Sequence, residues 1–169
     1  LAQHATFEEV CFLLWHRRLP TRGELGDLQS QLAAARLLPD GIIRLMRSLP
    51  IDMSTDAMGG LRTLVSALSH FDGEAEDNSR ESRYRQTVRL TARMGSVVAT
   101  YGRLSVGANM VEPDPVIGHA ANFLLMLNGT RPSAAEARAL DVALILHADH
   151  ELNASTFAGR VTAATLSDL

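Results

Sequence analysis

The stretch from Leu140 to Leu146 constrains the fold more than any other part of this sequence. It reads Leu-Asp-Val-Ala-Leu-Ile-Leu and follows Ser133, which with Glu136 forms a capping box that starts a helix. A helix that carries this run is apolar nearly all round, so it must be buried on most sides. In a chain of 169 residues, that burial needs a partner subunit as well as the chain's own core. We therefore expect a helical protein that oligomerises.

The rest of the sequence shows the same helical periodicity. Thr6 with Glu9 and Thr21 with Glu24 form two further capping boxes, and no segment alternates apolar and polar residues with the period of a strand. The chain also lacks internal repeats. We predict the all-α class, with helices over residues 7–17, 21–36, 40–48, 61–71, 80–104, 116–127, 133–149 and 153–168.

Two connections and one charged face complete the expected architecture. Residues 51–60 are predicted to form a turn, and residues 72–79, which are acidic, a surface connection. Arg85, Arg89 and Arg93 recur every four residues in the longest helix, which predicts a solvated or carboxylate-paired face rather than a binding site for an anionic partner.

The composition excludes several classes of function. A hydrophobic content of 46% allows one domain or a large piece of one, and neither a membrane span of about 18 apolar residues nor a signal sequence is present. We expect a cytoplasmic protein that binds no membrane. The net charge of −3 and aromatic content of 5% give no drive toward nucleic acid. All sixteen basic residues are arginine, which excludes a Schiff-base lysine and a phosphate loop ending in Gly-Lys. The single cysteine, Cys11, lies in an apolar run and is predicted to be an inert core thiol.

Candidate functional residues cluster between His147 and Ser155, where the sequence reads His-Ala-Asp-His-Glu-Leu-Asn-Ala-Ser. His147 and His150 are three residues apart, which places both rings on one side of a helix end. Asn153 is a good N-cap, so the unpaired N–H groups of the next helix would face the same junction. Helix N-termini attract carboxylates and phosphates, which favours a small anion as ligand. The plain alternative is an interhelical corner with hydrogen-bonded histidines.

Two other chemistries find weaker support in this stretch. A metal site would use His147, Asp149, His150 and Glu151, but neither a His-Glu-x-x-His motif nor a set of cysteines completes it, so we predict none. Serine hydrolysis at Ser155 would lack the Gly-x-Ser-x-Gly elbow. His119, further upstream, is expected to be structural.

The same stretch carries a resemblance to a known family. His-Ala-Asp-His-Glu-Leu-Asn-Ala-Ser-Thr-Phe, residues 147–157, resembles the signature region of citrate synthases, of the short bacterial and archaeal type that includes 2-methylcitrate synthases. Further matching segments follow the family's order through nearly the whole chain. They are residues 6–10, 13–16, 19–21, 61–63, 65–68, 122–127, 140–142 and 160–161. One departure is Asp56-Ala57-Met58, where the family often carries His-Pro-Met.

The resemblance implies a fold, a reaction and a set of site residues. It implies that residues 1–169 form part of a large helical domain, without the small domain. Long antiparallel helices of this domain, at about residues 57–71, 80–104, 133–149 and 153–168, would make a homodimer interface. It implies condensation of acetyl-CoA with oxaloacetate to citrate and CoA in the tricarboxylic acid cycle, with the CoA thioester as substrate and no cofactor. His150 would contact oxaloacetate, Asn153 would hold the turn, and Ser155 would orient a catalytic histidine. His147 and Asp149 would contact these residues rather than the substrate.

The reaction needs more groups than this stretch supplies. A base at the thioester methyl, a donor at the thioester oxygen and a donor at the attacked ketone are all required, and His150 can serve only the last. In the family, other roles fall to a histidine in a downstream Gly-Pro-Leu-His-Gly segment, which is not in this sequence. We expect the 169 residues alone to be inactive. The alternatives are a 2-methylcitrate synthase, which uses propionyl-CoA, and a non-catalytic helical dimerisation module.

Overall fold

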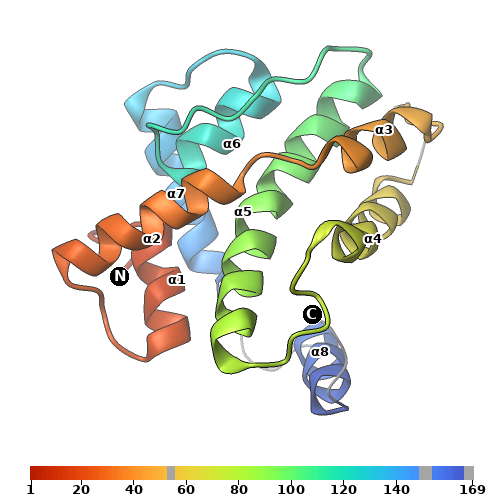
Figure 1. The fold of residues 1–169 in the computed structure, drawn as a ribbon. Coiled ribbons are helices and arrows are strands. Elements are labelled where there is room, and N and C mark those ends of the chain that lie inside the picture. Colours follow the sequence, from red (N-terminus) through yellow and green to blue (C-terminus); the bar gives the residue numbers. More distant parts are fainter. Residues whose placement is uncertain (53–55, 149–153, 166–169) are drawn as a thin grey trace.

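The computed structural model describes residues 1–52, 56–148 and 154–165. Within these ranges the chain forms α-helices and one 3-10 turn and no strand, so the predicted all-α class is confirmed (Figure 1). The elements are α1 Phe7–His16, α2 Arg22–Ala35, α3 Asp40–Ser48, α4 Ala57–Leu68, η1 Ser69–Phe71, α5 Arg80–Ser105, α6 His119–Asn128, α7 Ala134–His147 and α8 Ala154–Ala164.

Local capping fixes where most helices begin. At α1 the Thr6 hydroxyl accepts from the backbone N–H of Glu9, and the Glu9 carboxylate accepts from the N–H of Thr6 at 2.7 Å. The same reciprocal box starts α2 and α7, so the three predicted boxes are confirmed. Gly129 ends α6 in the left-handed conformation, with φ 81°, which a residue with a Cβ adopts only under strain.

Helix α5 is the centre of the molecule, and α2, α4 and α6 pack against it (Figure 1). Two apolar cores lie on two of its faces. One, between α3, α4 and α5, contains Leu38, Ile42, Met46, Leu64, Leu68, Val97 and Tyr101. The other, between α1, α2 and α5, contains Phe12, Leu28, Leu32, Val88 and Ala92. Within the described ranges, no helix is both long enough and apolar enough to cross a membrane.

Helix α4 begins at Ala57, which agrees with the start near residue 57 that the resemblance implies and lies four residues before the apolar periodicity that begins at 61. The carboxylate of Asp56 accepts from the N–H of Met58 at 3.0 Å and so caps the first turn. Gly60 lies in this helix, and the ring of Tyr101 on α5 packs so closely against it that a Cβ on Gly60 would overlap the ring. Gly60 therefore permits a close helix contact, and the glycine pair does not form the predicted turn.

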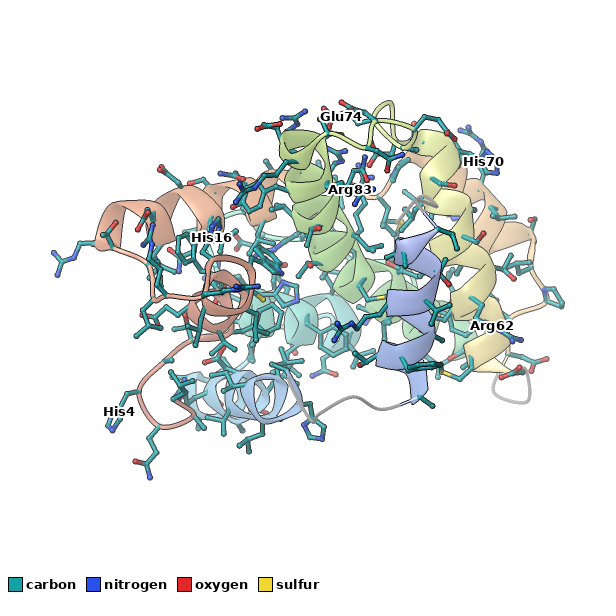
Figure 2. The ribbon with its side chains drawn as sticks, turned by 90° about the horizontal axis from the view of Figure 1, so that it is seen from below. His4, His16, Arg62, His70, Glu74 and Arg83 are labelled. Atoms are coloured by element: carbon teal, nitrogen blue, oxygen red, sulfur yellow. The ribbon has the colours of Figure 1, made fainter. Side chains whose placement is uncertain are left out.

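The acidic connection before α5 is tied to that helix by ion pairs. Arg89 bonds the Asp72 carboxylate through two nitrogens at 2.7 Å and Glu74 through a third, also at 2.7 Å. Arg85 also pairs with Glu74, which Figure 2 shows beside the amino-terminal end of α5. Hydrogen bonds from Arg85 and Arg89 lower the pKa of Glu74 to about 2. The expected carboxylate-paired face is confirmed for these two arginines, whereas the buried Nε of Arg93 has no partner among the described residues.

Helix α7 is less covered than its sequence predicts. In its apolar run, Ile145 is buried, Leu140 and Leu144 are half-buried, and Leu146 is 63% exposed. The other described helices, mainly α1 and α6, cover only part of α7. Burial of its remaining faces by a partner subunit, which the apolar run also predicts, stays a prediction.

Candidate functional site

The predicted site lies at the junction of α7 and α8, of which the structure describes the two flanks. Asp149, His150 and Asn153, together with Glu151, lie outside the described residues, so the predicted shared face of the two histidines stays a prediction. His147 is the last residue of α7, and its Nδ1 lies 2.7 Å from the carbonyl oxygen of Ala143. Its ring is therefore held by the preceding turn of its own helix.

Ser155 is the second residue of α8 and lies in its first turn, as predicted. The side chain is exposed, and so is every described residue of α8, including Phe157 at 59%. The helix lies at the lower edge of the molecule in Figure 1. The described part of the chain therefore leaves Ser155 open rather than enclosed in a pocket.

The position of α7 is set by a polar contact with the amino-terminal segment. Asp141, buried in α7, accepts from the backbone N–H of Phe7 at 2.8 Å and pairs with Arg138 at 2.5 Å. Arg138 also donates to the carbonyl oxygens of Ala2 and Ala5 at 2.7 and 2.8 Å. The bonds to Ala2, Ala5 and Phe7 join residues more than 130 positions apart and orient the helix that leads into the predicted site.

A second buried polar contact was missed by the sequence analysis. The Glu8 carboxylate accepts from the backbone N–H of His119 at 2.8 Å, at the first turn of α6. The His119 ring stacks on Phe7 with 4.6 Å between ring centroids. Burial lowers the pKa of His119 to about 4, so the ring is neutral at pH 7, and its Nδ1 has no hydrogen-bond partner among the described residues. The expected structural role of His119 fits this packing. The available signal was Glu8 itself, because an acidic residue on a buried helix face needs a specific donor.

An apolar groove of about 510 Å³ runs between α1, α5, α6 and α7. Among the described residues that line the groove, His119 alone is ionisable, and a neutral imidazole offers little to a charged substrate. The groove therefore fits an apolar surface better than a dicarboxylate. Its main apolar walls are Phe7, Met94, Val98, Phe123, Leu140 and Leu144.

The described residues hold no group of three or more histidine, cysteine or carboxylate side chains placed to bind a metal ion. Three of the four residues in the alternative metal site lie outside those residues, so that alternative is not tested. Burial, reinforced by Glu8, raises the pKa of the Cys11 thiol to about 12, which agrees with an inert core cysteine.

Comparison with known proteins places these features in a family. The family model described as citrate synthase, C-terminal domain, matches residues 1–169. A citrate synthase from Haloferax volcanii is 50% identical over 172 residues, and a 2-methylcitrate synthase from Shewanella oneidensis is 37% identical over 172 residues. Each alignment covers the whole of this chain but 45% and 44% of the relative, so the chain spans under half the length of these proteins.

Solved structures agree over the same span. The crystal structure of citrate synthase from Pyrobaculum aerophilum superposes with a TM-score of 0.93 at 38% identity, over all of this chain and 44% of that one. A citrate synthase from Thermoplasma acidophilum, in a ternary complex with carboxymethyl coenzyme A and oxaloacetate, superposes with a TM-score of 0.90 at 29% identity, over 99% of this chain and 43% of that one. The sequence match, the helical fold and the order of the motifs along it agree, and the chain belongs to the citrate synthase family.

Proposed function

We propose that the protein containing this chain condenses acetyl-CoA with oxaloacetate to give citrate and CoA, as an acyltransferase of the tricarboxylic acid cycle. The observation that carries this proposal is the similarity of the whole chain to citrate synthases, at 50% identity to the Haloferax volcanii protein. A solved relative that binds oxaloacetate and a CoA analogue has the same fold over 99% of the chain. The reaction is proposed from that similarity, and the roles of the residues at the α7–α8 junction are proposed from the chemistry of their side chains.

The α7–α8 junction is the proposed contact point for oxaloacetate. Ser155 lies in the first turn of α8, an eleven-residue helix whose N-terminus carries partial positive charge. With Asn153 as the proposed cap, the free N–H groups of that turn would favour a carboxylate. His150 would donate a hydrogen bond to the keto oxygen of the same molecule and make its carbon more electrophilic. His147 and Asp149 would position that histidine.

The carbon–carbon bond requires further groups that we place outside residues 1–169. A base must remove a proton from the thioester methyl, and the resulting enolate carbon attacks the ketone carbon while the ketone oxygen gains a proton. Water then cleaves the thioester and releases CoA as a thiol. Since this chain contains no Gly-Pro-Leu-His-Gly segment, we propose that it is part of the large helical domain and is inactive by itself.

We also propose that the intact enzyme is a homodimer joined through the helical faces that this chain leaves uncovered. The groove between α1, α5, α6 and α7 is apolar, and Leu146 and Phe157 are exposed on α7 and α8. Apolar surface of this kind is typical of obligate interfaces. A second copy that covers these faces would bury the apolar side chains of α7 that the described chain leaves exposed.

A turnover assay with the full-length protein tests the reaction. Release of thiol from acetyl-CoA should depend on oxaloacetate, and His150→Ala should lower kcat/KM for oxaloacetate by about 10- to 150-fold, because a buried hydrogen bond to a charged ligand contributes about 1.5–3 kcal/mol. His70→Ala is the matched control, since His70 is exposed in η1. Unchanged kinetics in the His150 variant would remove that residue from the site. Absence of turnover in the full-length protein would favour a non-catalytic dimerisation module instead.

A second candidate is 2-methylcitrate synthesis from propionyl-CoA and oxaloacetate. The Shewanella oneidensis relative of that name, 37% identical to this chain, favours it less strongly than the Haloferax volcanii protein favours citrate synthesis. The ratio of kcat/KM for acetyl-CoA to that for propionyl-CoA, measured on the intact enzyme, distinguishes the two. A ratio above one supports citrate synthesis.

A further inference from the structure

A buried guanidinium just after the end of α2 lacks the partners that such a group needs. Arg36 follows the last residue of α2 and is only 2% exposed. One of its terminal nitrogens donates to the carbonyl oxygen of Ile117 at 2.9 Å, but its Nε has no hydrogen-bond partner among the described residues. None of the ion pairs in the described ranges includes it. A buried charge with one neutral acceptor is costly, and the partial negative charge at the end of α2 offsets little of that cost.

A buried carboxylate borders the same cavity. Arg36 and Glu8 both line a space of about 340 Å³ between α1, α2 and the segment that leads into α6. Glu8 is 3% exposed, and one of its oxygens accepts from the N–H of His119. The negative charges of Glu8 and of Asp114, which lies outside the cavity lining, both act on Arg36, although neither carboxylate forms an ion pair with it. The cavity therefore holds two opposite, buried charges that do not contact each other.

These charges select the chemistry of an occupant. A simple anion would pair with the guanidinium but would be repelled by Glu8. A simple cation would pair with Glu8 but would be repelled by Arg36. A molecule that carries both charges pairs with each group and replaces the water that each lost on burial. The remaining lining includes the side chains of Gln29 and Ser30, which offer polar contacts to a small ligand.

The cavity also has room for such a molecule. Gly26, which is exposed in the second turn of α2, lines the mouth of the cavity, and a Cβ on Gly26 would meet no atom within 4 Å. A glycine inside a helix costs about 1 kcal/mol relative to alanine. Its position at the wall of the cavity keeps this side open to an occupant several atoms across.

We propose that this cavity binds a small zwitterion of the α-amino acid type, whose carboxylate accepts hydrogen bonds from Arg36 and whose ammonium group donates to Glu8. The site is formed by α1, α2 and residues 115–118, and it contains no residue of the α7–α8 junction. It is therefore a second binding site, and its existence does not depend on the reaction proposed above.

Calorimetric titration of the full-length protein tests the charge requirement. L-alanine is the probe, and acetate and methylammonium each carry one of its two charges. We expect L-alanine to bind at least about tenfold more tightly than either ion, since two charge-assisted hydrogen bonds replace one. Glycine betaine should also bind at least about tenfold more weakly, because its quaternary nitrogen has no hydrogen to donate to Glu8. Acetate that binds as tightly as L-alanine would overturn the proposal, and so would the absence of any L-alanine binding, which would mean that the cavity holds only water.

Three variants locate the binding. Arg36→Gln and Glu8→Gln each remove one charge but keep a hydrogen-bonding side chain, and each should weaken L-alanine binding by at least about tenfold. Gly26→Leu should block the cavity without touching either charge, and it should also favour the helix. Arg22→Gln, an exposed change at the start of α2, is the matched control. If binding survives in Gly26→Leu, whose fold is checked by thermal unfolding, the ligand lies elsewhere and the proposal is wrong.

Discussion

The contact between Asp141 and the amino-terminal segment provides the sharpest test of how α7 is positioned. Asp141→Ala removes the acceptor for the backbone N–H of Phe7 and the carboxylate partner of Arg138. The Asp141 side chain is 12% exposed, so little water can replace these bonds, whereas the Arg138 side chain is 40% exposed and can be resolvated. The carboxylate therefore carries most of the expected loss.

The magnitude follows from that difference in exposure. A hydrogen bond to a charged group contributes about 1.5–3 kcal/mol, and breaking a fully buried ion pair costs about 3–5 kcal/mol. Because this pair is open on the arginine side, we expect Asp141→Ala to lower the free energy of unfolding by about 2–4 kcal/mol. For a protein of this size, the melting temperature should fall by about 5–12 °C.

Urea unfolding followed by circular dichroism measures the change. Asp141→Asn keeps an oxygen for the N–H of Phe7 but loses the charge, so it should retain about half of the lost stability. Asp27→Ala, an exposed change in α2, is the matched control and should change the free energy of unfolding by less than about 0.5 kcal/mol. If Asp141→Ala matches this control, the amino-terminal segment is not held by Asp141 and the account of α7 is wrong.

Three further outcomes are expected. The unfolded chain binds a proton at His119 below about pH 6.5 but the folded chain only near pH 4, so the free energy of unfolding should fall by up to about 3 kcal/mol as the pH drops through that window. His119→Gln should flatten this part of the pH profile of stability. An unchanged slope in the variant would count against a buried, neutral imidazole. Gly60→Ala should destabilise the protein by about 1–3 kcal/mol because its Cβ would overlap the Tyr101 ring. Gly26→Ala, whose Cβ would lie in open space, should stabilise it by about 0.5–1 kcal/mol. Equal effects of the two variants in urea unfolding would contradict the close α4–α5 contact. Val98→Glu, in the apolar groove, should shift the proposed dimer toward monomer in sedimentation velocity, whereas Val116→Glu, on an exposed loop outside the groove, should not; a dimer unchanged by the first variant would place the interface elsewhere.

Local chemistry explains why much of the fold could be predicted from the sequence. A capping box such as Thr6 with Glu9 is complete within four residues, so the sequence alone identifies it. The local pattern alone places the start of α4 too late, because the Gly59-Gly60 pair has two physical uses. A turn uses the conformational freedom of glycine, and a helix contact uses its lack of a side chain, and only the position of Tyr101 decides between them.

The candidate site could be predicted only as far as its residues are neighbours in sequence. Ser155 lies in the first turn of a helix as the pattern around Asn153 indicates, while the orientation of His150 remains a prediction. The contacts of Asp141 with Phe7 and of Glu8 with His119 join residues more than 100 positions apart, which no local pattern reports. A buried carboxylate in an apolar run indicates that a donor exists but not which residue supplies it.

The partial exposure of α7 shows what an apolar helix pattern can and cannot specify. The pattern fixes how much of the helix surface must leave water, because each face contributes about 25 cal/mol per Å² when it is covered. It does not distinguish cover by the same chain from cover by another subunit, since both remove the same surface from water. Ile145 is covered by α1 and the segment before it, whereas Leu146 remains 63% exposed. Leu146 is therefore an apolar residue of the helix pattern that the described chain does not cover, so its burial would need a second subunit. For this reason the groove and α8 are the surfaces on which assembly should be tested.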